Sequence, residues 1–99
     1  MPQRLTGQVV LVNKNQVYDG PDNLSGRAYR LRQHPDNQPQ TVVYFGRDGN
    51  GTVTPQTGYP LMKDECVEVN FCNYADSTLE ALKWVANKDN ARVCWMRLA

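Results

Sequence analysis

Long hydrophobic runs, paired cysteines and a surplus of charge of either sign are all missing from this chain of 99 residues. Its apolar runs, such as Val9 to Val12, fall far below the roughly 20 residues that a membrane-spanning helix needs. We therefore expect no membrane association. The N-terminus carries one arginine among polar residues and lacks the apolar block, roughly 7 to 15 residues long, of a secretory signal. Synthesis and retention in a reducing cytosol are expected.

The chain has three cysteines, an odd number that makes a poor disulfide framework, and no paired CxxC spacing of a zinc site. Cys66 and Cys72 lie six residues apart, which is on the order of 20 Å along an extended strand. This exceeds the limit of roughly 7 Å between bridged Cα atoms. Cys94 could face either of them from a neighbouring strand. For each cysteine we expect the role of a small buried hydrophobe.

Eleven basic and ten acidic side chains give a formal net charge of +1, which provides no global field to attract nucleic acid or a membrane surface. Any such partner would need a local patch of positive charge on the surface. Hydrophobic residues make up 40% of the chain, as in soluble folded proteins. A chain of this length can bury one core, so residues 1–99 are expected to form a single domain.

Strand signals dominate the sequence. In the segment 27–33, Arg30 and Arg32 alternate with Tyr29 and Leu31, which places the two pairs on opposite faces of a strand. Proline and other turn-forming residues indicate loops over 14–26 and 34–40. The predicted strands are 7–13, 27–33, 41–46, 65–71, 82–86 and 91–98, with 51–54 as a further short candidate.

The segment 65–71 alternates clearly enough to assign its two faces. Val67, Val69 and Phe71 are predicted to point toward the core. The other face carries Cys66 and Glu68 and is mixed in character. This segment is therefore expected to cover the core with one face only.

The segment from Ser77 to Ala86 has two interpretations. Ser77 and Glu80 have the spacing of a capping box, which is compatible with a helix of up to about ten residues. The alternative is a short helical turn over 77–81 followed by a strand over 82–86. We favour the strand, because 87–90 is a natural hairpin loop and 91–98 is long enough to pair with what precedes it.

These patterns together predict a mainly all-β fold. Six or seven short strands joined by polar turns are typical of a small antiparallel β-sandwich or barrel. At most one short helix is expected, near 77–83.

Catalytic and metal-binding signals are weak. His34 is the only histidine, and it lies in a loop sequence with no nearby serine or cysteine nucleophile. Asp48 and Asn50 have the alternation that begins a calcium loop, but the further acidic ligands and the terminal glutamate are missing. The carboxylates of Asp64, Glu68 and their neighbours fit solvated surface charge. We expect no enzymatic activity, no metal and no cofactor.

A local basic feature favours an alternative, nucleic-acid-binding interpretation. Arg30, Arg32 and His34 would share one strand face and could follow phosphates, while an aromatic ring such as Tyr44 stacks a base. The same charges fit the solvent face of a sandwich or a guarded edge strand equally well. The alternative nucleic-acid patch consists of Arg27, Tyr29, Arg30 and Arg32.

The second half of the chain has an ordered series of motifs: an aromatic strand ending in glycine, a V-T pair, a G-x-P-L turn, an acidic position, a strand and a final hairpin. The residues that form this series are Tyr44, Phe45, Gly46, Val53, Thr54, Gly58, Tyr59, Pro60, Leu61, Glu65, Val67, Val69, Val85, Ala86, Val93 and Cys94. In this order the segment resembles small β-sandwich proteins of tailed-bacteriophage virions. Where the family often has proline and glycine, this chain has Met62, Lys63 and Asp64.

The resemblance implies a capsid decoration or cement subunit, or a head or tail accessory subunit. Such a protein is made in the cytoplasm of the host bacterium and resides in the virion. Its implied partners are a capsid or tail protein and further copies of itself. A phage-encoded inhibitor of a host protein remains an alternative, because such an inhibitor needs no motif.

The resemblance also suggests where contacts would form. Gly58 would permit a sharp turn, Pro60 would fix its entry and Leu61 would anchor the connection in the core. The contact surface would comprise the 47–63 loop and an edge strand, with Trp84 and Trp95 expected in the core. The expected partner-binding residues are Arg47, Asp48, Asn50, Thr57, Tyr59, Met62 and Lys63.

Overall fold

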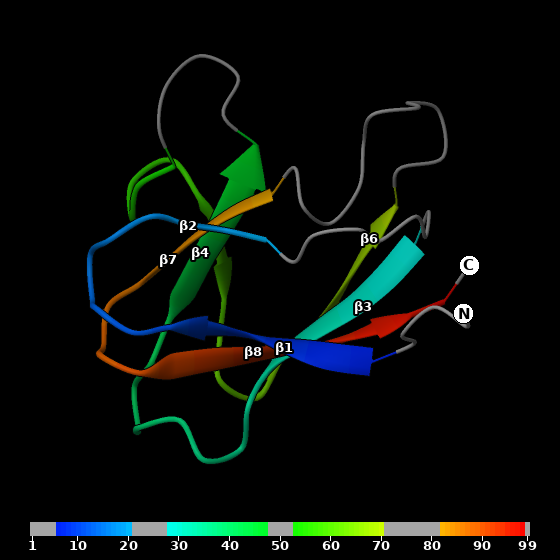
Figure 1. Cartoon of the computed structure of the whole chain (residues 1–99), viewed down its shortest axis with the longest axis horizontal. Coiled ribbons are helices and arrows are strands. Elements are labelled where there is room, and N and C mark those ends of the chain that lie inside the picture. The colour runs from blue at the N-terminus through cyan, green and yellow to red at the C-terminus, as the bar shows by residue number, and fades with distance from the viewer. Residues whose placement is uncertain (1–5, 21–27, 48–52, 71–81, 99) are drawn as a thin grey trace.

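The computed structural model describes residues 6–20, 28–47, 53–70 and 82–98, and shows a β-sandwich of two four-stranded antiparallel sheets (Figure 1). Within these ranges every regular element is a strand. In spatial order, the first sheet contains β1 (Thr6–Leu11), β8 (Ala91–Arg97), β3 (Ala28–Gln33) and β6 (Cys66–Asn70). The second sheet contains β2 (Tyr18–Asp19), β7 (Leu82–Ala86), β4 (Val43–Arg47) and β5 (Tyr59–Leu61).

The core lies between the two sheets and is built around two tryptophans. Trp84 of β7 is fully buried and packs against Phe45, with ring centroids 5.4 Å apart. Trp95 of β8 meets Tyr29 edge-on, at a centroid distance of 5.8 Å. Burying a large side chain of this kind stabilises a fold by about 1.5 to 3 kcal/mol. The expectation that both tryptophans are core residues is confirmed.

The register of the first sheet determines what its outer face displays. Arg32 in β3 lies opposite Cys94 in β8 on one side and Cys66 in β6 on the other. Two residues away, Arg30 lies opposite Met96 and Glu68 in the same manner. Because opposed residues of an antiparallel sheet share a face, these side chains lie together on the solvent side.

The predicted sandwich is confirmed, and so is the strand over 82–86, which is β7. The alternative ten-residue helix is wrong, because β7 pairs with β4 over all five of its residues. The predicted helical turn over 77–81 lies outside the described residues, as does Phe71. The outward orientation of Cys66 and Glu68 is confirmed, with Val67 and Val69 packed against the core.

The described residues form eight strands, where six or seven were predicted. Two residues of the predicted 14–26 loop form β2, because Tyr18 pairs with Trp84 and the Asp19 carboxylate accepts a hydrogen bond from Lys83. The predicted 51–54 strand is not supported, since the described residues Val53 and Thr54 are not in a strand. Short elements of this kind depend on neighbours distant in sequence.

A buried amide network joins the two sheets. The side-chain amide of Gln33 donates to the carbonyl oxygens of Thr41 and Leu61, both at 2.7 Å. Its oxygen accepts from the Asn37 side chain at 3.0 Å. Asn37 in turn bonds the backbone N–H and C=O of Arg92, at 2.9 Å each. Gln33 is 0% exposed, so its partners would have no solvent to replace these bonds.

We predict that Gln33→Ala lowers the free energy of unfolding by about 2 to 4 kcal/mol, because it removes the buried hydrogen bonds of Gln33 to two carbonyl groups and to the Asn37 amide. Urea denaturation measures the change. Gln38→Ala is the matched control, since Gln38 lies exposed in the same connection. Equal effects of the two substitutions would contradict a stabilising role for the network.

Candidate functional site

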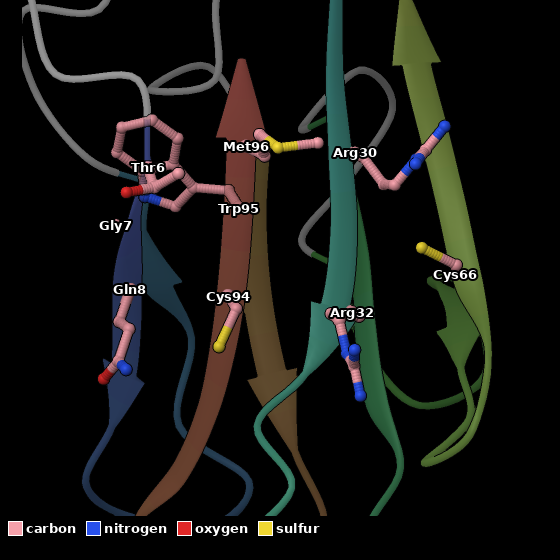
Figure 2. Close-up of a pocket in the computed structure, with 9 residues that line it drawn as sticks. All are labelled: Thr6, Gly7, Gln8, Arg30, Arg32, Cys66, Cys94, Trp95 and Met96. Atoms are coloured by element: carbon pink, nitrogen blue, oxygen red, sulfur yellow. The ribbon is translucent and has the colours of Figure 1, made fainter. Parts of the chain in front are cut away.

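A hollow of about 520 Å³ lies on the outer face of the first sheet (Figure 2). We call this surface the arginine face, because Arg30 and Arg32 project from β3 along one side of the hollow. The other outward side chains that line it come from three strands. They are Thr6, Gln8, Cys66, Cys94 and Met96.

The two arginines differ in their partners. Arg30 Nη2 donates to the Glu68 carboxylate at 2.8 Å, with both side chains about half exposed. This hydrogen bond, and then the negative charge of Glu68, raise the pKa of Arg30 above its ordinary value. Among the described residues, no carboxylate forms an ion pair with Arg32. Arg32 is therefore the cation of this face that is available to an external anion.

Two thiols flank Arg32 on either side. Cys94 and Cys66 are separated by β3, so their strands lie two spacings apart, roughly 10 Å. A disulfide between them is excluded in the folded chain, because bridged Cα atoms lie within roughly 7 Å. Cys66 is exposed and Cys94 partly exposed. The expectation of a buried cysteine is wrong for Cys66, which is exposed, and is not met by Cys94, which is partly exposed, because alternation in β6 and β8 directs both outward. Cys72 lies outside the described residues.

The alternative nucleic-acid patch is only partly assembled. Arg30 and Arg32 come together, whereas Tyr29 is 0% exposed on the core side and Arg27 lies outside the described residues. Tyr44 belongs to β4 in the second sheet. His34 follows the end of β3, where its Nδ1 accepts a hydrogen bond from the Asp36 N–H at 3.0 Å. Neither Tyr29 nor Tyr44 offers a stacking ring to the arginine face.

Residues on β1 and β8 complete the hollow, and these were not identified as site residues from the sequence. Gln8, Cys94 and Met96 occupy alternating outward positions in their strands. The period-two pattern of 91–98 contained this signal. Which other strands would lie beside β8 could not be read from that pattern, because sheet order depends on long-range pairing.

A second candidate surface is residues 53–63, which contain β5 and lie between β4 and β6; we call this segment the 53–63 connection. Its first turn is closed by hydrogen bonds from the Gly58 N–H to the Thr54 carbonyl, at 2.8 Å, and from the Thr54 N–H to the Thr57 hydroxyl, at 2.9 Å. A Cβ at Gly58 would lie 2.8 Å from the Tyr44 Cβ. Glycine is thus needed for close packing, whereas its φ lies outside the left-handed region, so the turn itself does not require glycine as was expected. Leu61 is 0% exposed, which confirms the predicted anchor.

The 53–63 connection displays two large apolar side chains. Tyr59 is 60% exposed, and the centroid of its ring lies 5.6 Å from that of the Phe45 ring. Met62 is 44% exposed. Lys63, by contrast, donates a hydrogen bond to the Asn37 backbone carbonyl at 2.6 Å, so its ammonium group already has a partner within the molecule. Of the remaining expected contact residues, Thr57 helps to close the turn, because its hydroxyl accepts the hydrogen bond from the Thr54 N–H. Arg47 ends β4, and Asp48 and Asn50 lie outside the described residues.

In the described ranges, no group of three or more histidine, cysteine, aspartate or glutamate side chains is placed to hold a metal ion. The same ranges contain no helix of the length and apolar character needed to cross a membrane.

Comparison with protein-family models, curated proteins and solved structures gives no match to this chain. Its function is therefore inferred from the geometry of its own residues.

We predict that mild oxidation of the folded protein does not link Cys66 to Cys94, because β3 keeps their strands two spacings apart. Non-reducing peptide mapping checks this. The same chain oxidised in denaturant is the control, since there the two thiols can meet. A Cys66–Cys94 peptide recovered at high yield from the folded sample would contradict the observed strand order.

Proposed function

We propose that this chain is a non-enzymatic structural subunit of a tailed-phage virion. It acts as a capsid decoration or cement protein, or as a head or tail accessory subunit, and binds the particle surface as an oligomer. Its partner is a capsid or tail protein, and it reaches the virion after synthesis in the cytoplasm of the host bacterium. The observation that supports this proposal best is the anchored 53–63 connection, which holds Tyr59 and Met62 toward solvent.

The connection has the physical properties of a preformed contact surface. Leu61 is buried in the core, and the turn before it is closed by its own hydrogen bonds. Binding through Tyr59 and Met62 would therefore order little additional backbone. Aromatic side chains account for a large share of interface energy when a partner covers them. This arrangement suits firm binding to a regular surface such as a shell or tail.

The first test of the proposal is the composition of the particle. Mass spectrometry of purified virions of the encoding phage is expected to detect the chain at a stoichiometry set by the particle lattice. Its absence from those particles would overturn the proposal.

The second test concerns the contact residues. Tyr59→Ala is expected to weaken binding to particles lacking the protein by at least about tenfold, because an exposed aromatic anchor is lost. Sedimentation of the variant with such particles measures this change. Leu98→Ala is the matched control, because Leu98 is an exposed apolar residue away from the 53–63 connection. A wild-type affinity for Tyr59→Ala would remove the connection from the contact surface.

The arginine face supports a second candidate function, the binding of single-stranded nucleic acid. Arg30 and Arg32 line one hollow, and Arg32 has no ion-pair partner among the described residues. Phosphate groups would be its natural ligands. The burial of Tyr29 argues against base stacking as an added source of affinity.

If this second function holds, a single-stranded oligonucleotide should bind at low salt, and Arg32→Ala should reduce the slope of log affinity against log salt by about 0.7. Fluorescence anisotropy at several salt concentrations measures both values. Lys88→Ala is the charge-matched control, because Lys88 lies in the loop between β7 and β8, outside the hollow. No binding at low salt would exclude the function.

A further inference from the structure

Four of the described strands lie at sheet edges, and they differ in how well their edges are protected against further pairing. β2 has two residues and ends in a charged aspartate, and β5 has three residues with Pro60 at its centre. β6 carries Glu68. β1 has six residues, Thr6–Leu11, and contains neither a proline nor a charged side chain. Short length, proline and charge are the usual protections of sheet edges, and β1 has none of them.

The geometry of β1 makes it a regular template for pairing. It pairs with β8 in unbroken register from Thr6 opposite Met96 to Leu11 opposite Ala91, without a bulge. Within the described strands, β8 is its only neighbour in the sheet. Its opposite edge therefore presents backbone N–H and C=O groups with no strand partner in the described part of the chain. Such an edge can accept a further strand.

The side chains of β1 hold the strand firmly on its own sheet. Val9 and Leu11 are buried in the core, whereas Val10 is 47% exposed. At Gly7 a Cβ would lie 2.6 Å from the Trp95 ring, so this ring packs directly over Gly7. Core packing thus holds β1 in place, and pairing along its edge would order little additional backbone.

We propose that β1 is the surface through which two copies of this chain associate, by antiparallel pairing of β1 with β1 about a twofold axis. The pairing joins the first sheets of both copies into one continuous sheet. This inference rests on the proposed function in one respect, since it specifies how the virion subunit forms its oligomer.

The composition of β1 favours a second copy over a foreign strand. In a twofold antiparallel pair the strand lies opposite itself, and opposed residues share a face. Inward residues therefore meet inward residues, and outward residues meet outward residues. With Gln8 opposite its own copy, Thr6 would meet Val10, and Gly7 would meet Val9. Because β1 is uncharged, this self-pairing brings no like charges together.

The pairing has a consequence for the arginine face. A twofold axis perpendicular to the sheet keeps both arginine faces on the same side of the joined sheet. The hollow reaches Gln8 on β1, so the hollows of the two copies would lie on either side of the axis. The dimer would therefore present one broad face that carries Arg30 and Arg32 twice.

The test is the solution mass of the intact chain by light scattering at micromolar concentration. The wild type is expected at twice the 11.2 kDa chain mass, or at a larger even multiple. Val10→Lys should raise the dissociation constant by about 100-fold or more, because it places lysines on both copies of the paired edge. Gln8→Lys is a second variant at another outward position of β1, and circular dichroism checks the folding of each.

Met96→Lys is the matched control. Met96 is 40% exposed on the same outer face, but it lies on β8, one strand inward from the edge. Edge pairing predicts that Met96→Lys leaves the mass unchanged. Dissociation by Met96→Lys alone would indicate face-to-face association and overturn the inference.

The remaining outcomes separate this inference from the proposed function. A monomeric wild type, an odd multiple of the chain mass, or folded β1 variants with the wild-type mass would overturn the pairing of β1. Detection of the chain in virions would leave the proposed function standing in each of these cases. Conversely, a dimer dissociated by Val10→Lys supports the pairing even if the chain is absent from particles.

Discussion

Burial of one face of each sheet against the other is the constraint on which the structure depends. In β3, the alternation that places Tyr29 and Leu31 at 0% exposure necessarily directs Arg30 and Arg32 to solvent. A register shift of one residue would exchange these faces and bury two guanidinium groups. The arginine face is therefore a consequence of core packing.

The same constraint explains why a chain with so many polar residues contains buried amides. Where β3 ends and the chain crosses to the second sheet, backbone carbonyls of Thr41 and Leu61 are removed from water. Gln33 satisfies both carbonyls, and Asn37 satisfies the backbone of Arg92 in β8. Lys63 bonds the Asn37 carbonyl, which ties the end of the 53–63 connection to this network. The display of Tyr59 and Met62 is thus coupled to a buried polar structure.

Two surfaces of the molecule would serve different contacts in the proposed subunit. The 53–63 connection offers apolar side chains on an anchored backbone, whereas β1 offers backbone hydrogen-bonding groups on an uncharged edge. β1 belongs to the first sheet and β5 to the second, so the two surfaces arise from different sheets. A subunit built in this way could bind its own copy through one surface and a lattice through the other.

The sequence by itself determined the all-β class, the strands near 28–33, 43–47, 66–70, 82–86 and 91–97, and the placement of Arg30 and Arg32 on the face opposite Tyr29 and Leu31. These features follow from local alternation and turn chemistry, which act over a few residues. Tertiary structure alone decided the strand order, the formation of β2 and β5, the placement of β3 between Cys94 and Cys66, and the position of β1 at the edge of its sheet among the described strands. The physical reason is that each depends on pairing between residues distant in the chain. In such pairing, the burial of a shared core selects one arrangement among many that satisfy the same local pattern.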